Sequence, residues 1–464
     1  MTRFGLLAIG LVAALAGCAA PAPAVPTEAV PAQDAVAAAA VEHLGAYECE
    51  MPEIAEVDML CGHLTVPLDP ADPAGAQIEL AVTLSTPAAP RGLMVLLGGG
   101  PGGSAIWLVP QVAGLLPEIG GEYQLLALDQ RGTGATAPDC PEVQAQTGSS
   151  DIRPASQDAV AECAELIADW RPHLASSDVV ADLEALRQAL GAPTWVLNGT
   201  SYGTLTAMRY AMAHPEAVAG LVLDSALPPE GAEPLFLASM QALPAALERA
   251  CAVTGCASDP VEDLAAVIAA GYDELALFDA IVSTSIIQPT FPGVPEALAA
   301  ARAGDPSALD ELVATTQQAS ESPLWMFSAA THIATMCLDT PLPWGADVTD
   351  PAERRVALDA AVAALAPEDT WPFTTSVAAR VATVTACEVW PESLQLPTGL
   401  LPDVPVLLLA GEQDLSTPAA DAAVLAERFP RGELVVVEMA GHGVQATPTG
   451  REALADFLAG VLTE

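Results

Sequence analysis

One serine stands between two glycines at the point where an apolar run gives way to a helical pattern. Trp195–Leu197 is apolar, Gly199–Gly203 has the sequence Gly-Thr-Ser-Tyr-Gly, and Thr204–Ala213 has helical spacing before His214. A strand that turns at once into a helix makes a tight turn, in which side chains beside the serine would clash. The pattern therefore predicts a sheet edge that presents the hydroxyl of Ser201. An ordinary glycine-rich turn is the simpler alternative.

Further apolar runs bounded by Gly, Pro or Asp predict buried strands. Between them lie helical patterns such as Asp178–Leu190, which Gly191 ends. Continuous apolar strands that alternate with helices indicate a mostly parallel sheet covered on both faces. The sequence thus predicts an α/β fold with an eight-stranded sheet. The expected strands are His63–Val66 and Ile78–Leu84 at one edge, then Leu93–Leu97, Tyr123–Leu128, Trp195–Leu197, Leu221–Leu223, Val404–Leu409 and Leu434–Val437.

The alternation of strands and helices stops after Asp224. Residues 230–385 are rich in alanine, helical in pattern and poor in strand runs, and the strand pattern returns at Val404. We expect these residues to form an inserted helical cap over the sheet edge where α/β sites lie. A chain of 464 residues is too long for one compact core, so a second domain is expected. Because the cap is inserted, the α/β core is expected to consist of two parts of the chain, 47–229 and 386–464.

The N-terminus has the features of an export signal. Arg3 precedes the apolar run Phe4–Ala16, which is too short to span a bilayer. Leu-Ala-Gly-Cys at 15–18 resembles a bacterial lipobox, so residues 1–17 are expected to be a signal peptide and Cys18 to carry lipid. An ordinary signal cut after Ala24 is the alternative. Residues 18–46 are expected to be an extended Ala/Pro-rich tether. The protein is then expected to be a cell-envelope lipoprotein, or a secreted protein if the lipobox is not used.

The chain is strongly acidic and contains no lysine. It has 59 Asp and Glu residues against 15 arginines. Nucleic acids would be repelled, because phosphate binding needs basic patches. Anionic substrates are disfavoured as well, whereas a positively charged substrate end, such as a free peptide amino group, would be tolerated or attracted. We expect the membrane to be reached only through the lipid on Cys18.

Eight cysteines remain when Cys18 is set aside, and an even number suits an oxidising compartment. Sequence alone does not determine their connectivity, but pairing of near neighbours is expected. No cysteine or histidine grouping has zinc spacing, so neither a metal nor another cofactor is expected. The expected disulfides are Cys49–Cys61, Cys140–Cys163, Cys251–Cys256 and Cys337–Cys387.

A serine hydroxyl is a weak nucleophile and needs a base. Among the six histidines, only His442 directly follows an apolar strand, in Ala-Gly-His-Gly at 440–443. His332 falls in the expected cap, where a packing role is the simpler interpretation. We therefore predict His442 as the general base of Ser201.

The base needs an orienting carboxylate. Asp414 follows the strand Val404–Leu409, and the order Ser201, Asp414, His442 is the chain order expected for a serine turn in this type of α/β fold. Asp224 is the second candidate, and Glu412 is a weaker one.

A developing oxyanion also needs donors. The run 98–104, Gly-Gly-Gly-Pro-Gly-Gly-Ser, follows a predicted strand, and its bare backbone could approach a negative charge. The N–H groups of Gly100 and Tyr202 are the predicted donors. A phosphate-binding loop is excluded, because the lysine of such loops is missing. Asp129–Gly134 is expected to support the glycine run through an ion pair and a turn.

Taken together in this order, these motifs resemble the secreted tripeptidyl aminopeptidases and the related prolyl aminopeptidases. The resemblance covers residues 47–464 and includes the cysteine-containing segments near 251–256, 336–339 and 387–391. It implies an α/β-hydrolase core, a helical cap and removal of residues from free peptide N-termini, with Ser201, Asp414 and His442 as the triad. Asn198 and Thr200 replace glycines that are common in this family, and a cysteine usual near the C-terminal end is missing.

An aminopeptidase also needs a carboxylate for the substrate ammonium group. Glu233, Asp339 and Glu388 are the candidates, although each could be an ordinary surface acid in so acidic a chain. Two other functions remain open at this point. One is an esterase that uses the same triad on small esters, and the other is a tethered binding protein without activity. Oligomeric state is left open.

Overall fold

The computed structural model describes residues 35–51, 57–88, 90–392 and 400–461. The expected signal peptide, the lipidation site Cys18 and the alternative cleavage site after Ala24 lie outside the described residues. None of the described helices is long and apolar enough to cross a membrane.

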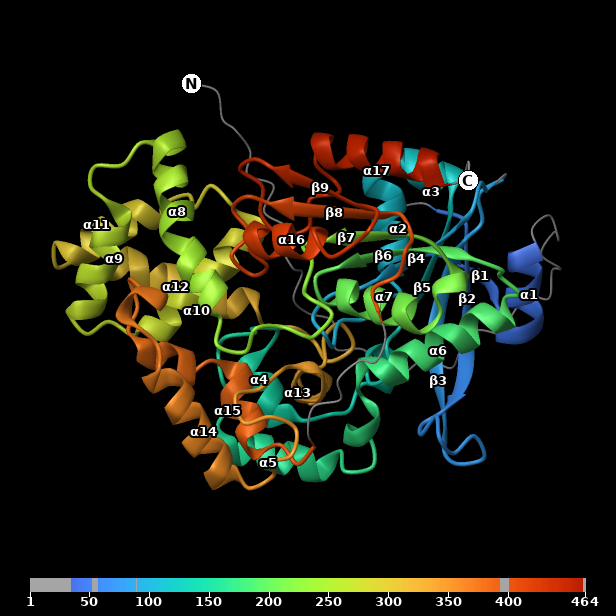
Figure 1. Ribbon diagram of the computed structural model, residues 1–464, viewed down its shortest axis with the longest axis horizontal. Coiled ribbons are helices and arrows are strands. Elements are labelled where there is room, and N and C mark those ends of the chain that lie inside the picture. Colours follow the sequence, from blue (N-terminus) through green and yellow to red (C-terminus); the bar gives the residue numbers. More distant parts are fainter. Residues whose placement is uncertain (1–34, 52–56, 89, 393–399, 462–464) are drawn as a thin grey trace. The chain divides into compact units, whose positions relative to one another are not determined.

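A mixed sheet of nine strands forms the centre of the fold (Figure 1). The strand order is β1-β2-β3-β5-β4-β6-β7-β8-β9. The six strands from β5 to β9 in this order are parallel to one another, and β3 is antiparallel to β5. The strands are β1 Tyr47–Cys49, β2 Met59–Pro67, β3 Gln77–Ser85, β4 Leu93–Leu97, β5 Gln124–Leu128, β6 Trp195–Thr200, β7 Val218–Asp224, β8 Val406–Gly411 and β9 Gly432–Val437.

The sequence predicts eight strands, and the additional strand in the structure is β1. β1 is only three residues long and pairs antiparallel with β2, Tyr47 opposite Cys61. So short a strand has no periodic pattern of its own, and it forms through pairing with β2 and the Cys49–Cys61 disulfide. β2 and β3 are antiparallel, as expected of an edge hairpin.

Helices cover both faces of the sheet. One face packs against α2 Leu108–Leu115, α3 Pro117–Glu122 and α17 Pro448–Val461, which share a buried apolar cluster with the strands. The other face carries α1 Ala35–Leu44, α6 Ser176–Ala189, α7 Tyr202–Ala213 and α16 Ala419–Ala426 (Figure 1). Burial on both faces explains why β4, β5 and β8 are apolar throughout.

The expected extended tether is wrong for its final part. Residues 35–44 form α1, which buries Ala37, Ala40 and Leu44 and packs against β2. Alanine has the highest helix propensity, and apolar residues three and four apart give α1 one face to bury. Ala/Pro content alone did not distinguish this segment from the residues before it.

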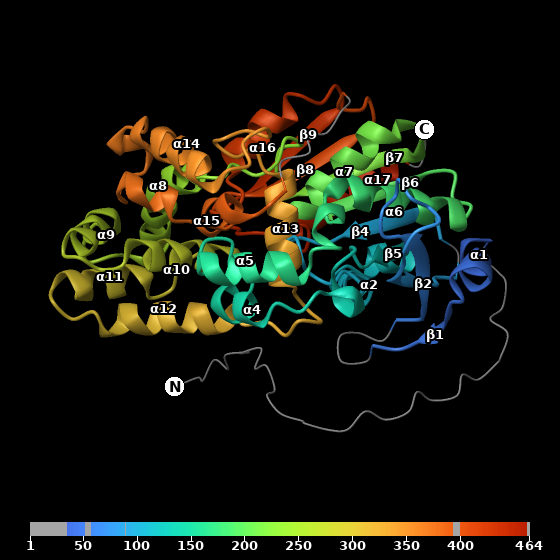
Figure 2. The ribbon, with the colours of Figure 1, turned by 90° about the horizontal axis from the view of Figure 1, so that it is seen from below.

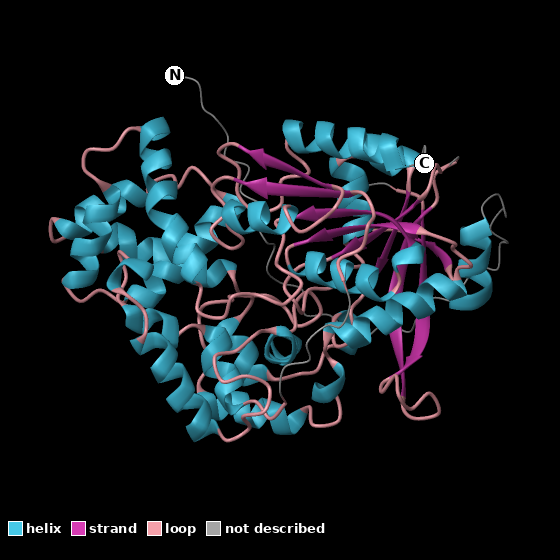
Figure 3. Cartoon of the chain, viewed as in Figure 1, coloured by secondary structure: helices cyan, strands magenta, loops and turns pink. Residues whose placement is uncertain are grey.

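Helices α8–α15 occupy the chain between β7 and β8, and α4 and α5, which lie between β5 and β6, join them (Figures 2 and 3). We call this set of helices the helical layer. One apolar cluster runs through it, from Val143 and Val160 to Leu338 and Trp390. The helices of the helical layer are α4 Pro141–Thr147, α5 Gln157–Leu166, α8 Leu237–Thr254, α9 Pro260–Ala269, α10 Glu274–Ile287, α11 Val294–Arg302, α12 Ser307–Ala319, α13 Ala329–Asp339, α14 Pro351–Ala363 and α15 Ala382–Val389.

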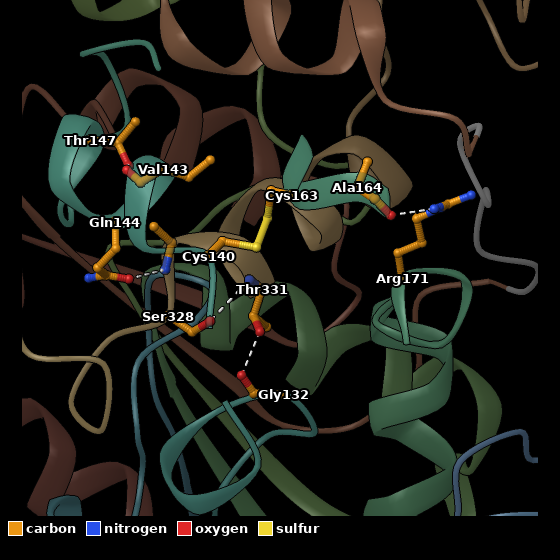
Figure 4. Close-up of a disulfide and its surroundings, with 11 residues drawn as sticks. Gly132, Cys140, Val143, Gln144, Thr147, Cys163, Ala164, Arg171, Ser328 and Thr331 are labelled. Atoms are coloured by element: carbon orange, nitrogen blue, oxygen red, sulfur yellow. Dashed lines mark hydrogen bonds between the residues drawn. A yellow bond between two sulfur atoms is a disulfide. The ribbon is translucent and has the colours of Figure 1, made fainter. Parts of the chain in front are cut away.

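Three of the four disulfides lie in the helical layer: Cys140–Cys163, Cys251–Cys256 and Cys337–Cys387. With Cys49–Cys61 these are the pairs that near-neighbour pairing predicts. The bond between Cys140 and Cys163 joins α4 to α5 next to the start of α13 (Figure 4). The sequence does not predict that α4 and α5 belong to this layer, because their contacts are with helices far along the chain.

Candidate active site

Ser201 occupies the turn between β6 and α7 with φ 58° and ψ −128°. This is a sparsely populated conformation for a residue with a side chain. A Cβ at Gly203 would lie 2.1 Å from the carbonyl oxygen of Leu97, and one at Gly199 would lie 2.5 Å from the carbonyl oxygen of Gly203. The two glycines are therefore required by close backbone approach, which holds the Ser201 side chain at the carboxyl edge of the sheet.

Asp414 and His442 meet at the same edge. Asp414 follows β8 and His442 follows β9, which is the parallel neighbour of β8. His442 Nδ1 lies 2.8 Å from Asp414 Oδ2. The other carboxylate oxygen, Oδ1, accepts the amide hydrogens of Ser416 at 2.9 Å and Thr417 at 3.1 Å. This arrangement fixes the orientation of the His442 ring and leaves Nε2 free of the Asp414 carboxylate.

Thr417 is a further member of this group that sequence reasoning missed. Its hydroxyl donates to Asp414 Oδ2 at 2.6 Å and lies 3.3 Å from His442 Nδ1. The position three residues after the acid in a turn was the available signal, because a threonine there can return its hydroxyl to the carboxylate.

The charges of the acid and the base support each other. Burial by itself raises the pKa of Asp414, but the attraction of His442 and hydrogen bonds from His442 and Thr417 outweigh it and hold that pKa below its usual value. Burial by itself lowers the pKa of His442, but Asp414, Asp224 and Asp151 together raise it above the usual histidine value. The lowered pKa means that Asp414 is ionised near neutral pH.

Asp224, the second candidate for the acid, has another role. Its two carboxylate oxygens accept the amide hydrogens of Val444 at 2.9 Å and Gln445 at 3.0 Å. Gly443 N–H also donates to the hydroxyl of Ser225 at 2.9 Å. The end of β7 therefore holds the loop that carries His442. Glu412, the weaker candidate, accepts the Met439 amide hydrogen at 3.2 Å.

The two unusual residues of the serine turn contact that same loop. Asn198 donates through Nδ2 to Gln445 Oε1 at 2.8 Å, and Gln445 donates through Nε2 to Thr200 Oγ1 at 3.2 Å. Their side chains thus link the turn of Ser201 to the loop of His442. Between Ser201 Oγ and His442, both among the described residues, no direct hydrogen bond is present. Catalytic hydrogen bonds of this kind are often long until substrate binds.

The glycine run lies against Ser201. A Cβ at Gly99 would be 2.9 Å from the Ser201 Cβ, and Gly100 lines the same pocket as Ser201. The Tyr202 N–H is at the first position of α7, where the helix supplies no acceptor for its amides. Gly100 and Tyr202 therefore both stand beside the serine, where a developing oxyanion would need donors.

Hydrogen bonds to Asp129 and from Ser328 support the glycine run and the residue after it. Asp129 Oδ1 accepts from the Ser104 hydroxyl at 2.9 Å and from the Ala105 amide at 2.6 Å, as its expected supporting role requires. The run is also tied to the helical layer, since Ser328 N–H donates to Gly102 O at 2.9 Å. The buried Arg131 forms its ion pair with Asp182 at 2.8 Å, away from the glycine run.

The pocket beside Ser201 contains three carboxylates. Glu233, predicted from the sequence, is one of them, and Asp151 and Asp421 are the two that sequence reasoning missed. None of the described residues that line the pocket is Arg or His. Its lining consists of Gly100, Asp151, Ser201, Ala226, Leu227, Pro228, Ala232, Glu233, Phe236, Ala238, Ser239, Met336, Ser416, Thr417, Pro418 and Asp421.

The other two predicted acids lie elsewhere and have partners of their own. Asp339 is buried, pairs with Arg209, and accepts from the Tyr202 hydroxyl at 2.7 Å and the Ser176 amide at 2.9 Å. Glu388 pairs with Arg355. Neither is among the residues that line the pocket of Ser201. Within the described residues, no group of three or more His, Cys, Asp or Glu could hold a metal ion.

Comparison with known proteins agrees with this geometry. The family described as "alpha/beta hydrolase fold" matches residues 92–252, and the family described as "TAP-like protein" matches residues 373–461. A tripeptidyl aminopeptidase from Streptomyces lividans is 26% identical over 438 residues, covering 83% of this chain and 78% of that protein. The serine protease Hip1 from Mycobacterium tuberculosis is 29% identical over 194 residues, covering 38% of this chain and 37% of that protein.

Among solved structures, the proline iminopeptidase from Mycobacterium smegmatis is 18% identical with a TM-score of 0.43, covering 87% of this chain and 99% of that one. The two family matches span the serine turn and the loops after β8 and β9, which are the segments that form the site. From the strand order, the site and the two family matches, the chain has the α/β-hydrolase fold and is a serine hydrolase.

Proposed function

We propose that this serine hydrolase is an exopeptidase that releases residues or short peptides from free peptide N-termini. The observation that carries the proposal is the pocket beside Ser201, which is lined by three carboxylates and by no described basic side chain. A free N-terminus is a cation, and it gains most from such a lining. Similarity to a tripeptidyl aminopeptidase over most of both chains supports the same substrate class.

The proposed reaction uses Ser201, His442 and Asp414 as a triad. His442 Nε2 takes the proton of Ser201 Oγ as Oγ forms a bond to the acyl carbon, while Asp414 stabilises the imidazolium. The N–H groups of Gly100 and Tyr202 donate to the oxyanion. His442 then gives its proton to the leaving amine as the C–N bond breaks. Water, deprotonated by the same histidine, releases the acyl group from Ser201.

Export is part of the proposal. Four disulfides suit an oxidising compartment, because the cytosol keeps thiols reduced. We further propose that the chain is cut before Cys18 and lipidated there, which would leave it attached to the cell envelope. Mass spectrometry of the mature N-terminus tests this, and an unlipidated start after Ala24 would show a secreted protein instead.

The substrate class is tested with chromogenic amides that carry a free or a blocked N-terminus, together with short-chain esters. We expect cleavage of the free amides, weak cleavage of the blocked ones and no activity of Ser201→Ala. Ester hydrolysis without any amide cleavage would make the protein an esterase. Failure of a fluorophosphonate probe to label wild type, with Ser201→Ala as the control, would point to an inactive binding protein.

A further inference from the structure

Asp151 lines the same pocket as Ser201 and Gly100, yet it comes from the segment between α4 and α5, far from the triad in sequence. We propose that Asp151 anchors the positively charged amino group of the substrate and that His332 is the positioning residue that aims its carboxylate. The inference rests on the proposed exopeptidase function and names the group that recognises the free N-terminus.

His332 joins Asp151 to the glycine run. Its Nδ1 lies 2.9 Å from the carbonyl oxygen of Pro101, and its Nε2 lies 3.2 Å from Asp151 Oδ1. A carbonyl oxygen can only accept, so Nδ1 carries a proton. The Asp151 carboxylate lies on the opposite side of the ring, beside Nε2. His332, for which the sequence suggested only a packing role, thus connects the Asp151 carboxylate to the loop that contains Gly100.

One carboxylate oxygen of Asp151 has no partner among the described residues. His332 faces Oδ1, whereas Oδ2 has no hydrogen-bond partner among the described residues, and the side chain keeps 36% of its surface exposed. Both oxygens of Glu233, in contrast, already accept amide hydrogens, from Leu235 at 2.9 Å and Leu237 at 2.6 Å. An ammonium group needs an acceptor that is not already occupied, so Asp151 suits it better than Glu233.

The backbone on both sides of Asp151 is held in place. The Ser150 hydroxyl donates to Asp279 Oδ1 at 2.6 Å, and Ala382 N–H donates to Ile152 O at 2.9 Å. Fixed geometry of this kind favours recognition, because little freedom is lost when the ligand binds.

Asp151 and His332 are also held relative to each other. The Cys140–Cys163 disulfide closes the segment that contains Asp151 (Figure 4). Beside it, Gln144 on α4 accepts the Ala329 amide hydrogen at 3.0 Å, which fixes the start of α13, the helix that carries His332. The anchor and its positioning residue thus belong to one connected part of the helical layer.

The anchor lies close to the reacting atoms. Asp151 is one of the three carboxylates, with Asp414 and Asp224, whose charge raises the pKa of His442. Asp421 shares the pocket and also has no side-chain hydrogen bond among the described residues, but it is not among these three. Asp421 therefore provides a matched comparison, in which the same charge is removed from the same pocket at another place.

The test uses one, two or three alanines joined to p-nitroaniline or to p-nitrophenol, each with a free or an acetylated amino group. With the full chain, Asp151→Asn should lower kcat/KM of the free-amino substrates about 10- to 100-fold, mainly through KM, and leave the acetylated ones within about twofold. Asp421→Asn should change this discrimination less. His332→Ala should also raise KM selectively, and His332→Gln, which can still donate, should retain more discrimination.

The outcomes separate the anchor from the proposed function. Ester hydrolysis that prefers the free-amino form, with no amide cleavage, would support the anchor and contradict the exopeptidase proposal. Equal losses on free and acetylated substrates, a larger effect of Asp421→Asn, or no preference in wild type would overturn the anchor. If Asp151→Asn fails to fold, competitive inhibition of wild type by n-butylammonium but not by n-butanol is the expected result, and equal inhibition by both would overturn the anchor.

Discussion

At the scale of single residues, the hydroxyl of Thr417 contacts both Asp414 and His442. Thr417 donates to Asp414 and lies within reach of His442 Nδ1, so it restrains the carboxylate that orients the base. We predict that Thr417→Val lowers kcat about 10- to 100-fold with little change in KM, because a hydrogen bond to a charged group is lost while the shape is kept. Thr417→Ser retains the hydroxyl and is the control. Equal activity of the valine and serine variants would contradict this role.

The protonation of His442 gives a second prediction at this scale. Burial lowers its pKa, but Asp414, Asp224 and Asp151 together raise that pKa above the usual value. A protonated His442 could not accept the proton of Ser201. If His442 is the base, as proposed, kcat/KM should increase with pH through a midpoint above the usual histidine pKa of about 6.5. A pH profile with a neutral ester measures this midpoint. A midpoint below the usual value would show that burial prevails.

At the scale of secondary-structure elements, Asp339 joins three helices. From the end of α13 it pairs with Arg209 and accepts from Tyr202, both on α7, and from Ser176 on α6. Asp339→Asn leaves the buried guanidinium without its counter-charge and should cost about 3–5 kcal/mol of unfolding free energy. Denaturant unfolding measures this loss.

Asp263→Asn offers a matched control. Asp263 is also buried and paired, but its partner Arg302 is half exposed and can be hydrated. Its loss should therefore cost less than that of Asp339. A loss of equal size in the two variants would show that the network around Arg209 contributes no more than an ordinary pair.

At the scale of the whole molecule, charge affects the encounter with substrate. The formal net charge is −44, so a cationic substrate is attracted from a distance that salt shortens. We predict that kcat/KM for a free-amino substrate falls several-fold between about 0.05 and 0.5 M salt, while that of the acetylated substrate stays nearly constant. Parallel loss on both substrates would indicate a general effect of salt on the enzyme.

The sequence by itself determined the features that depend on neighbours in the chain. Apolar runs separated by helical patterns were enough to predict the parallel strands, and the glycines around Ser201 were enough to predict its turn, because close backbone approach permits little else. The expected order of acid and base followed from the strands after which they come. The triad itself stays a proposal, although Asp414 and His442 lie in contact.

Only the tertiary structure decided which distant side chains share the site. Asp339 had the same acidic character in sequence as Asp151, but packing placed the first in a buried ion pair and the second in the pocket. β1 and the position of α4 and α5 were likewise not foreseeable, since they depend on pairing and apolar contacts across the chain. Local pattern reports which face of an element is buried. The packing of the whole chain determines which other elements that face contacts, so the pocket beside Ser201 became visible only in three dimensions.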